Sequence, residues 1–113
     1  KLWGTGNPKR EFLYVDDLAK ACIFLMSNYN ENKIINVGSS VDLTIKELAE
    51  EVSNVIGFDG EIEFDPDMPD GTPRKLLDVS RIKSLGWSSS VDLKSGLKLT
   101  YDWYLKNAHS FSK

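Results

Sequence analysis

The segment from Leu43 to Gly57 constrains the fold most, because it carries both a start and a stop signal for one helix. Thr44 and Glu47 have the spacing of a capping box, in which each side chain binds the backbone N–H of the other residue, and Leu43 can pack onto Leu48 across this cap. Gly57 can adopt the left-handed conformation that ends a helix. The apolar residues between the two signals recur at helical spacing: Ile45, Leu48, Ala49, Val52 and Ile56. We therefore predict an amphipathic helix that buries one face against another element.

Three short apolar segments predict strands on either side of this helix. Residues 12–15 (FLYV) and residues 34–37 (IINV) are rich in β-branched and aromatic side chains, and residues 61–65 (EIEFD) are strand-like as well. Prolines and a glycine between Pro66 and Pro73 break all periodicity, which predicts a loop there.

Three further helices are expected. The first follows Asp16 and Asp17, either of which can cap it. Its expected inner face is formed by Leu18, Ala21, Cys22, Leu25 and Met26. A short helix between Asp78 and Gly86 would turn Ile82 and Leu85 inward, and a last helix is capped by Asp92. Its apolar positions are Leu93, Leu97, Tyr101, Tyr104 and Leu105.

The order of these elements predicts an α/β fold with a few short strands and about four helices. Three short strands make a thin sheet, whose apolar faces would be better covered if another sheet continued beyond them. The pattern therefore indicates a piece of a larger α/β protein.

Charge and composition exclude several classes of function. The net charge of −3 argues against nucleic acid and against an anionic membrane surface, both of which need a basic excess. The apolar run Ala21 to Met26 is far shorter than the roughly 20 residues that span a bilayer. The single cysteine, Cys22, cannot form an internal disulfide, and no signal segment leads the chain, so we expect a cytoplasmic location. Cys22 is expected to pack on an apolar helix face.

Residues that commonly carry catalysis stand in unsuitable positions. The GTG of residues 4–6 lacks the third glycine of a dinucleotide fingerprint, and Tyr29 and Lys33 are separated by residues typical of a helix exit. His109 lies close to the end of the chain, and no Cys/His cluster with metal-ligand spacing is present. We therefore expect no catalytic, cofactor-binding or metal-binding residue in this chain.

Two polar segments are the candidate binding site. In WGTGNPKRE, Trp3 and Arg10 flank a glycine turn, so that an indole face could stack on a planar base and a guanidinium could bind phosphate oxygens. In PDGTPRKLLD, Asp70 begins a turn, and Arg74 and Lys75 place two cations beside a proline. The residues alone leave a structural alternative open, with Trp3 in the core, Asp70 as a turn former and the cations as a solvated rim.

The longer motifs resemble those of a known family. The segments REFLYVDDLAKA, INVGS, PDGTPRKLLDVSRIKSLGW and LKSGLKLTYDWYLKN resemble the C-terminal third of the GDP-L-fucose synthase family, from about Leu2 to Asn107. These proteins are NADP-dependent GDP-4-keto-6-deoxy-mannose epimerase-reductases, which are extended short-chain dehydrogenases with a Rossmann-type fold. REFLYVDDLA is shared widely by that superfamily, whereas PDGTPRKLLD is particular to the fucose synthase branch.

The resemblance implies a site and a partner domain. A GDP-sugar would lie between a Rossmann domain and a smaller C-terminal domain, where Trp3 and Arg10 would contact the GDP moiety and Arg10 would bind the diphosphate. Asp70 would be a further substrate contact. We add Lys75 because the loop would otherwise bring little positive charge near two phosphates.

The family's cofactor and catalytic motifs have no counterpart in residues 1–113. Its glycine fingerprint, its Ser-Tyr-Lys triad and its epimerisation Cys and His belong to sequence upstream of Lys1. We therefore expect residues 1–113 to be a C-terminal substrate-binding portion, in which residues 12–38 pack on an N-terminal Rossmann domain. NADP(H) would serve the intact enzyme, and this portion alone should neither bind it tightly nor catalyse turnover. Exposed apolar faces could also be covered in a homo-oligomer.

Two alternatives stay open from the sequence. The chain could be part of another nucleotide-sugar epimerase or dehydratase, against which PDGTPRK argues. It could also be a non-catalytic binding or assembly module that ignores GDP.

Overall fold

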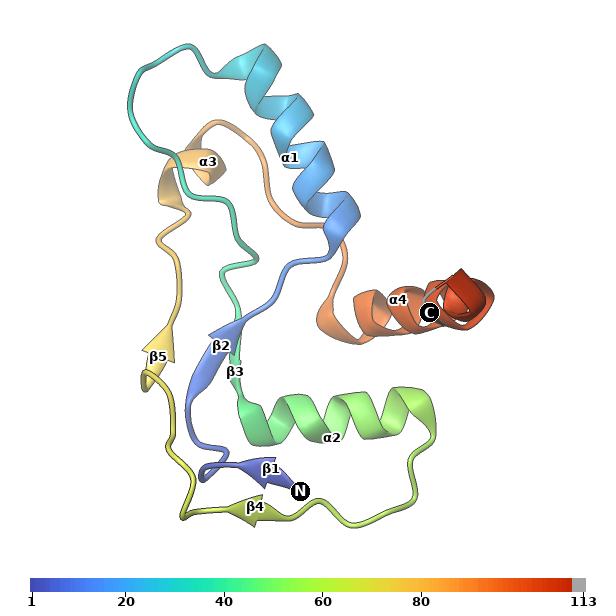
Figure 1. Cartoon of the computed structure of the whole chain (residues 1–113). Coiled ribbons are helices and arrows are strands. Elements are labelled where there is room, and N and C mark those ends of the chain that lie inside the picture. The colour runs from blue at the N-terminus through green and yellow to red at the C-terminus, as the bar shows by residue number, and fades with distance from the viewer. Residues whose placement is uncertain (111–113) are drawn as a thin grey trace.

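Two small β-sheets and four α-helices form the part of the chain that the computed structural model describes, residues 1–110 (Figure 1). In the first sheet, β1 (Leu2–Trp3) pairs in parallel with β4 (Phe64–Asp65). Lys1 Nζ lies 3.0 Å from Asp65 Oδ2. Of the strand predicted over residues 61–65, only these last two residues are in the sheet.

The second sheet has the strand order β3–β2–β5. β2 (Lys9–Glu11) is antiparallel to β3 (Asp42–Thr44) and parallel to β5 (Arg74–Lys75). Paired residues of neighbouring strands project from the same face of a sheet. The side chain of Arg10 therefore shares a face with its partners in the two ladders, Leu43 and Lys75.

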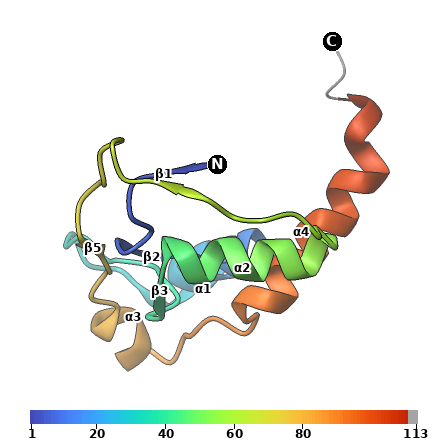
Figure 2. The same cartoon turned by 90° about the horizontal axis from the view of Figure 1, so that it is seen from below.

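The capping-box helix forms as predicted. α2 spans Ile45–Ile56; Thr44 Oγ1 accepts a hydrogen bond from Glu47 N at 3.1 Å, and Glu47 Oε2 accepts one from Thr44 N at 2.7 Å. The helix ends at Gly57, whose φ of 70° is left-handed. α2 contacts α4 (Leu93–Asn107), and Figure 2 shows the two helices meeting near the start of α4. Asp92 caps α4, as predicted, by accepting a hydrogen bond from Ser95 N at 2.8 Å.

Replacing Thr44 with alanine is expected to lower the free energy of unfolding by about 1 kcal/mol, because two backbone N–H groups lose or loosen their partners. Thr44→Ser retains the hydroxyl and should stay close to the wild type. Urea unfolding followed by circular dichroism measures both variants. Equal midpoints for Thr44→Ala and the wild type would contradict the role of the capping box.

The core is small and lies between α1 (Val15–Asn28) and α3 (Ser80–Ser84). Its buried apolar side chains among the described residues are Ala21, Val79 and Ile82. Half-buried neighbours complete it: Leu25, Ile35, Val37 and Trp87. The inward direction predicted for Ile82 is confirmed, whereas Leu85 is exposed. The short 3₁₀ helix η1 (Ala108–Ser110) follows α4.

Two predicted strands are wrong. Residues 12–14 are irregular backbone that leads from β2 into α1, and Val15 is already helical. Residues 34–37 are irregular too, held along α3 by hydrogen bonds from Arg81 Nη1 to Ile34 O and from Asn36 Nδ2 to Asp78 O. A strand needs a neighbour to complete its hydrogen bonds, and neither segment pairs with one within residues 1–110.

The prediction for α1 is also partly wrong. Its N-cap is Tyr14, and neither Asp16 nor Asp17 caps it. The predicted inner positions Leu18, Cys22 and Met26 are exposed, the last by 85%. The predicted inner positions Ala21 and Leu25 do pack in the core beside α3, so the prediction is confirmed for these two residues.

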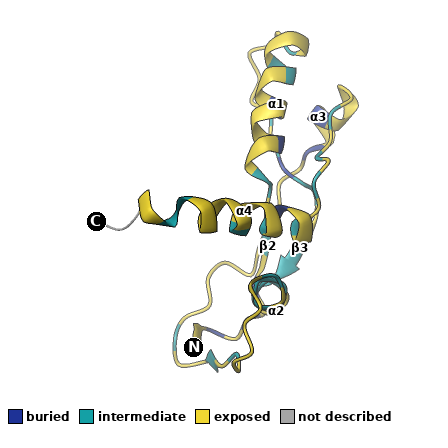
Figure 3. Ribbon diagram, turned by 90° about the vertical axis from the view of Figure 1, so that its right-hand side faces the viewer, coloured by how far each residue is buried: buried dark blue, intermediate teal, exposed yellow. Residues whose placement is uncertain are grey.

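The molecule is open rather than closed around one core. Its radius of gyration is 16.8 Å, against about 13 Å for a compact domain of this length. In Figure 3 much of α1 is exposed, and α4 extends away from the sheets. Large apolar side chains face solvent on α1 and on the segment that follows it: Val15, Leu18, Ile23, Met26 and Ile34. None of the helices within residues 1–110 has the length and apolar character that crossing a bilayer requires.

Candidate functional site

The glycine-rich turn and the PDGTP loop, more than 60 positions apart in the chain, meet at one small cavity. Three of the four predicted site residues line it: Trp3, Arg10 and Asp70. The cavity has a volume of about 70 Å³, and its other walls are Gly6, Pro8, Ile45, Pro69 and Gly71. The two sheets position these groups, because Trp3 ends β1, Arg10 is the middle residue of β2, and β5 follows the PDGTP loop.

Asp70 fastens its loop to the glycine turn. Its Oδ1 accepts a hydrogen bond from Thr5 N at 2.8 Å, and its Oδ2 accepts one from Thr5 Oγ1 at 2.7 Å. Gly4 allows this approach, because a Cβ at that position would stand 2.2 Å from Asp70 Oδ1 and its φ of +78° is left-handed. Asp70 is therefore more than a local turn former.

One edge of the Arg10 guanidinium is hydrogen-bonded within the protein and the other is not. Nη1 donates to Lys9 O and to Thr72 O, each at 2.6 Å. Nη2 and Nε have no hydrogen-bond partner among the residues that the structure describes. Gly71 leaves room for this edge, because a Cβ there would lie 2.8 Å from Nη2. Two parallel N–H donors fit two phosphate oxygens.

The two cations of the PDGTPRK motif differ in their surroundings. Arg74 is paired with Asp42, with Nε 2.5 Å from Oδ2 and Nη2 3.2 Å from Oδ1. The hydrogen bond from Arg74 holds the pKa of Asp42 below its ordinary value, and the same pair raises the pKa of Arg74. Lys75 is exposed and lies opposite Arg10 in the sheet, but it does not line the cavity.

Trp3 is 68% exposed, so the alternative that places it in the core is wrong. Trp3 lines the cavity together with Arg10 and Asp70. Thr5 was missed by sequence reasoning. Its contact with Asp70 spans 65 positions and leaves no local signal.

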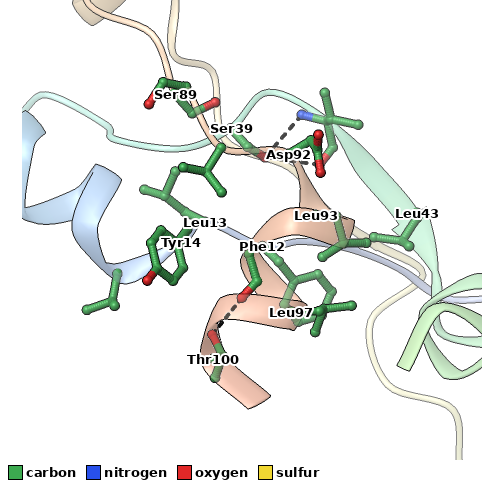
Figure 4. Close-up of a pocket in the computed structure, with 15 residues that line it drawn as sticks. Phe12, Leu13, Tyr14, Ser39, Leu43, Ser89, Asp92, Leu93, Leu97 and Thr100 are labelled. Atoms are coloured by element: carbon green, nitrogen blue, oxygen red, sulfur yellow. Dashed lines mark hydrogen bonds between the residues drawn. The ribbon is translucent and has the colours of Figure 1, made fainter. Parts of the chain in front are cut away.

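A larger pocket lies elsewhere and shares no lining residue with this cavity (Figure 4). It has a volume of about 650 Å³ and is walled mainly by apolar side chains from residues 12–15, from residues 39–43 and from the start of α4. Its carboxylate, Asp92, is the N-cap of α4, and the hydrogen bond from Ser95 N lowers its pKa. Within residues 1–110 no three His, Cys, Asp or Glu side chains gather where a metal ion could be held.

Comparison with solved structures defines the class of protein. A GDP-L-fucose synthetase from Naegleria fowleri bound to NADP matches 96% of this chain with a TM-score of 0.90 and 26% identity, although the chain covers only 35% of it. A UDP-glucose 4-epimerase from Thermotoga maritima matches with a TM-score of 0.84 and 29% identity, over 96% of this chain and 36% of that one. The profile of the NAD-dependent epimerase/dehydratase family matches residues 1–38. The chain has the α/β fold of the C-terminal part of Rossmann-type extended short-chain dehydrogenases.

Several sequence relatives of the chain are GDP-L-fucose synthases. GDP-L-fucose synthase 1 of Arabidopsis thaliana is 57% identical over 94% of this chain. GDP-L-fucose synthase of Escherichia coli K12 is 47% identical over 97%. The chain spans about a third of the length of these relatives, 33% and 37%, and matches their C-terminal third. The resemblance to GDP-L-fucose synthases that the motifs indicated is thereby confirmed.

Proposed function

We propose that the chain forms the GDP-sugar-binding part of a GDP-L-fucose synthase. The full-length enzyme would convert GDP-4-keto-6-deoxy-D-mannose to GDP-L-fucose by epimerisation at C3 and C5 and reduction at C4. The observation that carries this proposal is the meeting of Trp3, Arg10 and Asp70 at one cavity, in a chain whose relatives are GDP-L-fucose synthases.

Each residue has a role that its surroundings support. The exposed ring of Trp3 stacks on the guanine, as aromatic faces do on planar bases. The open Nε and Nη2 edge of Arg10 binds the diphosphate, and Lys75, on the same face of the sheet, adds positive charge beside it. Asp70 still has unused lone pairs that can accept hydrogen bonds from hydroxyl groups of the substrate.

The remaining parts of the reaction belong to a preceding Rossmann domain in this proposal. NADPH, bound by that domain, supplies the hydride for the reduction at C4. In this proposal residues 12–38 pack against the domain. The apolar side chains that α1 exposes support such a contact, as does Ile34, which is 88% exposed. Without the domain we expect these side chains to favour self-association and the chain to catalyse no turnover. The enzyme would work in the cytoplasm.

Calorimetric titration with GDP tests the site. The wild-type chain is expected to bind GDP, and Arg10→Ala to raise the dissociation constant at least tenfold, because a charged bidentate contact is lost. Arg10→Lys should fall between the two, since it keeps the charge but not the planar pair of donors.

The matched control is Arg81→Lys, which changes an exposed arginine that binds Ile34 O away from the cavity, and should leave the affinity unchanged. Titrations with UDP separate the alternatives. A preference for UDP would favour another nucleotide-sugar epimerase or dehydratase. No heat with either nucleotide, or an affinity insensitive to Arg10, would overturn the proposed site.

A further inference from the structure

We propose that Thr5 is a positioning residue that keeps the Asp70 carboxylate from pairing with Arg10, so that the guanidinium stays open to the diphosphate. This inference rests on the proposed function. Thr5 itself does not need to touch the ligand, and although it lies within WGTGNPKRE, its partner Asp70 is 65 positions away.

The contacts of Thr5 fix the direction of its hydroxyl. Asn7 N donates a hydrogen bond to Thr5 Oγ1 at 3.2 Å, so the hydroxyl oxygen accepts on that side. The same oxygen lies 2.7 Å from Asp70 Oδ2, and a carboxylate can only accept, so the hydroxyl donates there. Together with Thr5 N on Oδ1, this arrangement engages both carboxylate oxygens from one residue.

Arg10 and Asp70 line one cavity with opposite charges, yet no ion pair within 4.0 Å joins them in the described part of the chain. The two residues are near enough for a change in the Asp70 side chain to bring them together. Gly71, the residue after Asp70, lies beside Arg10, since a Cβ on Gly71 would be 2.8 Å from Arg10 Nη2. A carboxylate and a diphosphate compete for the same donors of an arginine fork. If Asp70 turned to Arg10, it would occupy the edge that the ligand needs.

Holding the two segments together does not by itself require Thr5. β2 and β5 pair directly, Lys9 N donates to Pro73 O at 2.8 Å, and Arg10 Nη1 binds Thr72 O. The hydrogen bonds between Thr5 and Asp70 are exposed, where such bonds add little to stability. Their main consequence is therefore the orientation of the carboxylate relative to Arg10.

The test combines nucleotide titration with a rescue variant. Thr5→Val removes the hydroxyl and should raise the dissociation constant for GDP about tenfold, whereas Thr5→Ser should bind like the wild type. Adding Asp70→Asn to Thr5→Val removes the competing charge. The double variant should then have the same dissociation constant for GDP as Asp70→Asn alone. With asparagine at position 70, the loss of the Thr5 hydroxyl no longer frees a carboxylate that could pair with Arg10. Guanosine has no diphosphate. The dissociation constants of Thr5→Val and the wild type should therefore differ much less for guanosine than for GDP.

A measurement without ligand separates this inference from the proposed function. Nitrogen NMR of the Arg10 guanidinium in the free protein should show new, shifted Nε and Nη signals in Thr5→Val but not in Thr5→Ser or in the double variant. If the wild type fails to bind GDP while this shift is seen, the proposed function is wrong, and only the part of the inference in which Thr5 keeps Asp70 away from Arg10 stands. If the guanidinium signals are unchanged, or if the double variant binds GDP more weakly than Asp70→Asn, the role of Thr5 is wrong.

Discussion

Replacing Asp17 with asparagine is expected to lower the free energy of unfolding by about 3 kcal/mol. Asp17 is buried, with 1% of its surface exposed. Its Oδ2 accepts hydrogen bonds from Ser90 N at 3.0 Å and from Val91 N at 2.9 Å. Its Oδ1 accepts one from Ser90 Oγ at 2.8 Å. An asparagine offers a single acceptor oxygen and turns an NH₂ group toward these donors. Because the core is so small, this loss is a large part of the stability to be expected.

Asp16→Asn is the matched control. It removes the same charge from the same helical turn, but Asp16 is exposed and lacks these contacts, so its unfolding midpoint should stay near that of the wild type. Urea unfolding measures both variants. Similar losses for the two would show that charge in the first turn of α1, rather than the buried hydrogen bonds, is responsible.

The pH dependence of stability follows from the same carboxylate. Burial alone would raise the pKa of Asp17, but the hydrogen bonds from Val91 and Ser90 outweigh it and lower the pKa below its ordinary value of 3.8. The folded state therefore binds the proton less readily than the unfolded state. The stability that Asp17 contributes is complete above pH 3.8 and is lost as the pH falls through that value toward the lower folded pKa. Asp17→Asn should flatten this part of the acid unfolding curve, and an unchanged curve would contradict the assignment.

Replacing Gly4 with alanine is expected to abolish GDP binding. The new Cβ would meet Asp70 Oδ1 at 2.2 Å and lie 3.4 Å from its Cα, so the loop would have to move away from the glycine turn. The left-handed φ of +78° adds strain of about 1 kcal/mol or more. Calorimetric titration with GDP, together with urea unfolding, measures the two effects.

Gly57→Ala separates strain from contact. Gly57 has a similar φ of +70°, but a Cβ there would meet nothing within 4 Å. The free energy of unfolding of Gly57→Ala should fall by about the strain energy of an alanine at this φ. Its affinity for GDP should stay that of the wild type. If Gly4→Ala still bound GDP normally, the approach of Asp70 to the glycine turn would not be needed for the site.

The helices were predictable where their signals are local. The capping box of Thr44 and Glu47, the stop at Gly57 and the cap at Asp92 each involve residues within a few positions of one another, so the sequence contains every partner. The α/β class followed from the order of the predicted elements, and the resemblance to GDP-L-fucose synthases was carried by long contiguous motifs. Trp3 and Arg10 could be named from their chemistry, and Asp70 from the resemblance of its motif, before their meeting was known.

Apart from β4, which lies within the predicted residues 61–65, the strands could not be predicted in this way, because a strand forms only where another segment pairs with it. Residues 12–15 and 34–37 have strand composition but no neighbour within the described chain, whereas Arg74 and Lys75 form β5 beside β2 despite little apolar character. For the same reason helical spacing could not show that Ala21 and Leu25 are covered while Leu18 and Met26, on the same predicted face, are exposed. Whether a face is buried depends on what lies next to it.

Local chemistry thus determined where α2 and α4 begin and which side chains are suited to a nucleotide. Tertiary contacts alone decided that Asp17 is a buried acceptor for Ser90 and Val91 rather than a helix cap, and that Thr5 holds Asp70. The physical reason is distance along the chain. These hydrogen bonds join residues 65 to 74 positions apart, and a donor that far away leaves no trace in the residues around its acceptor.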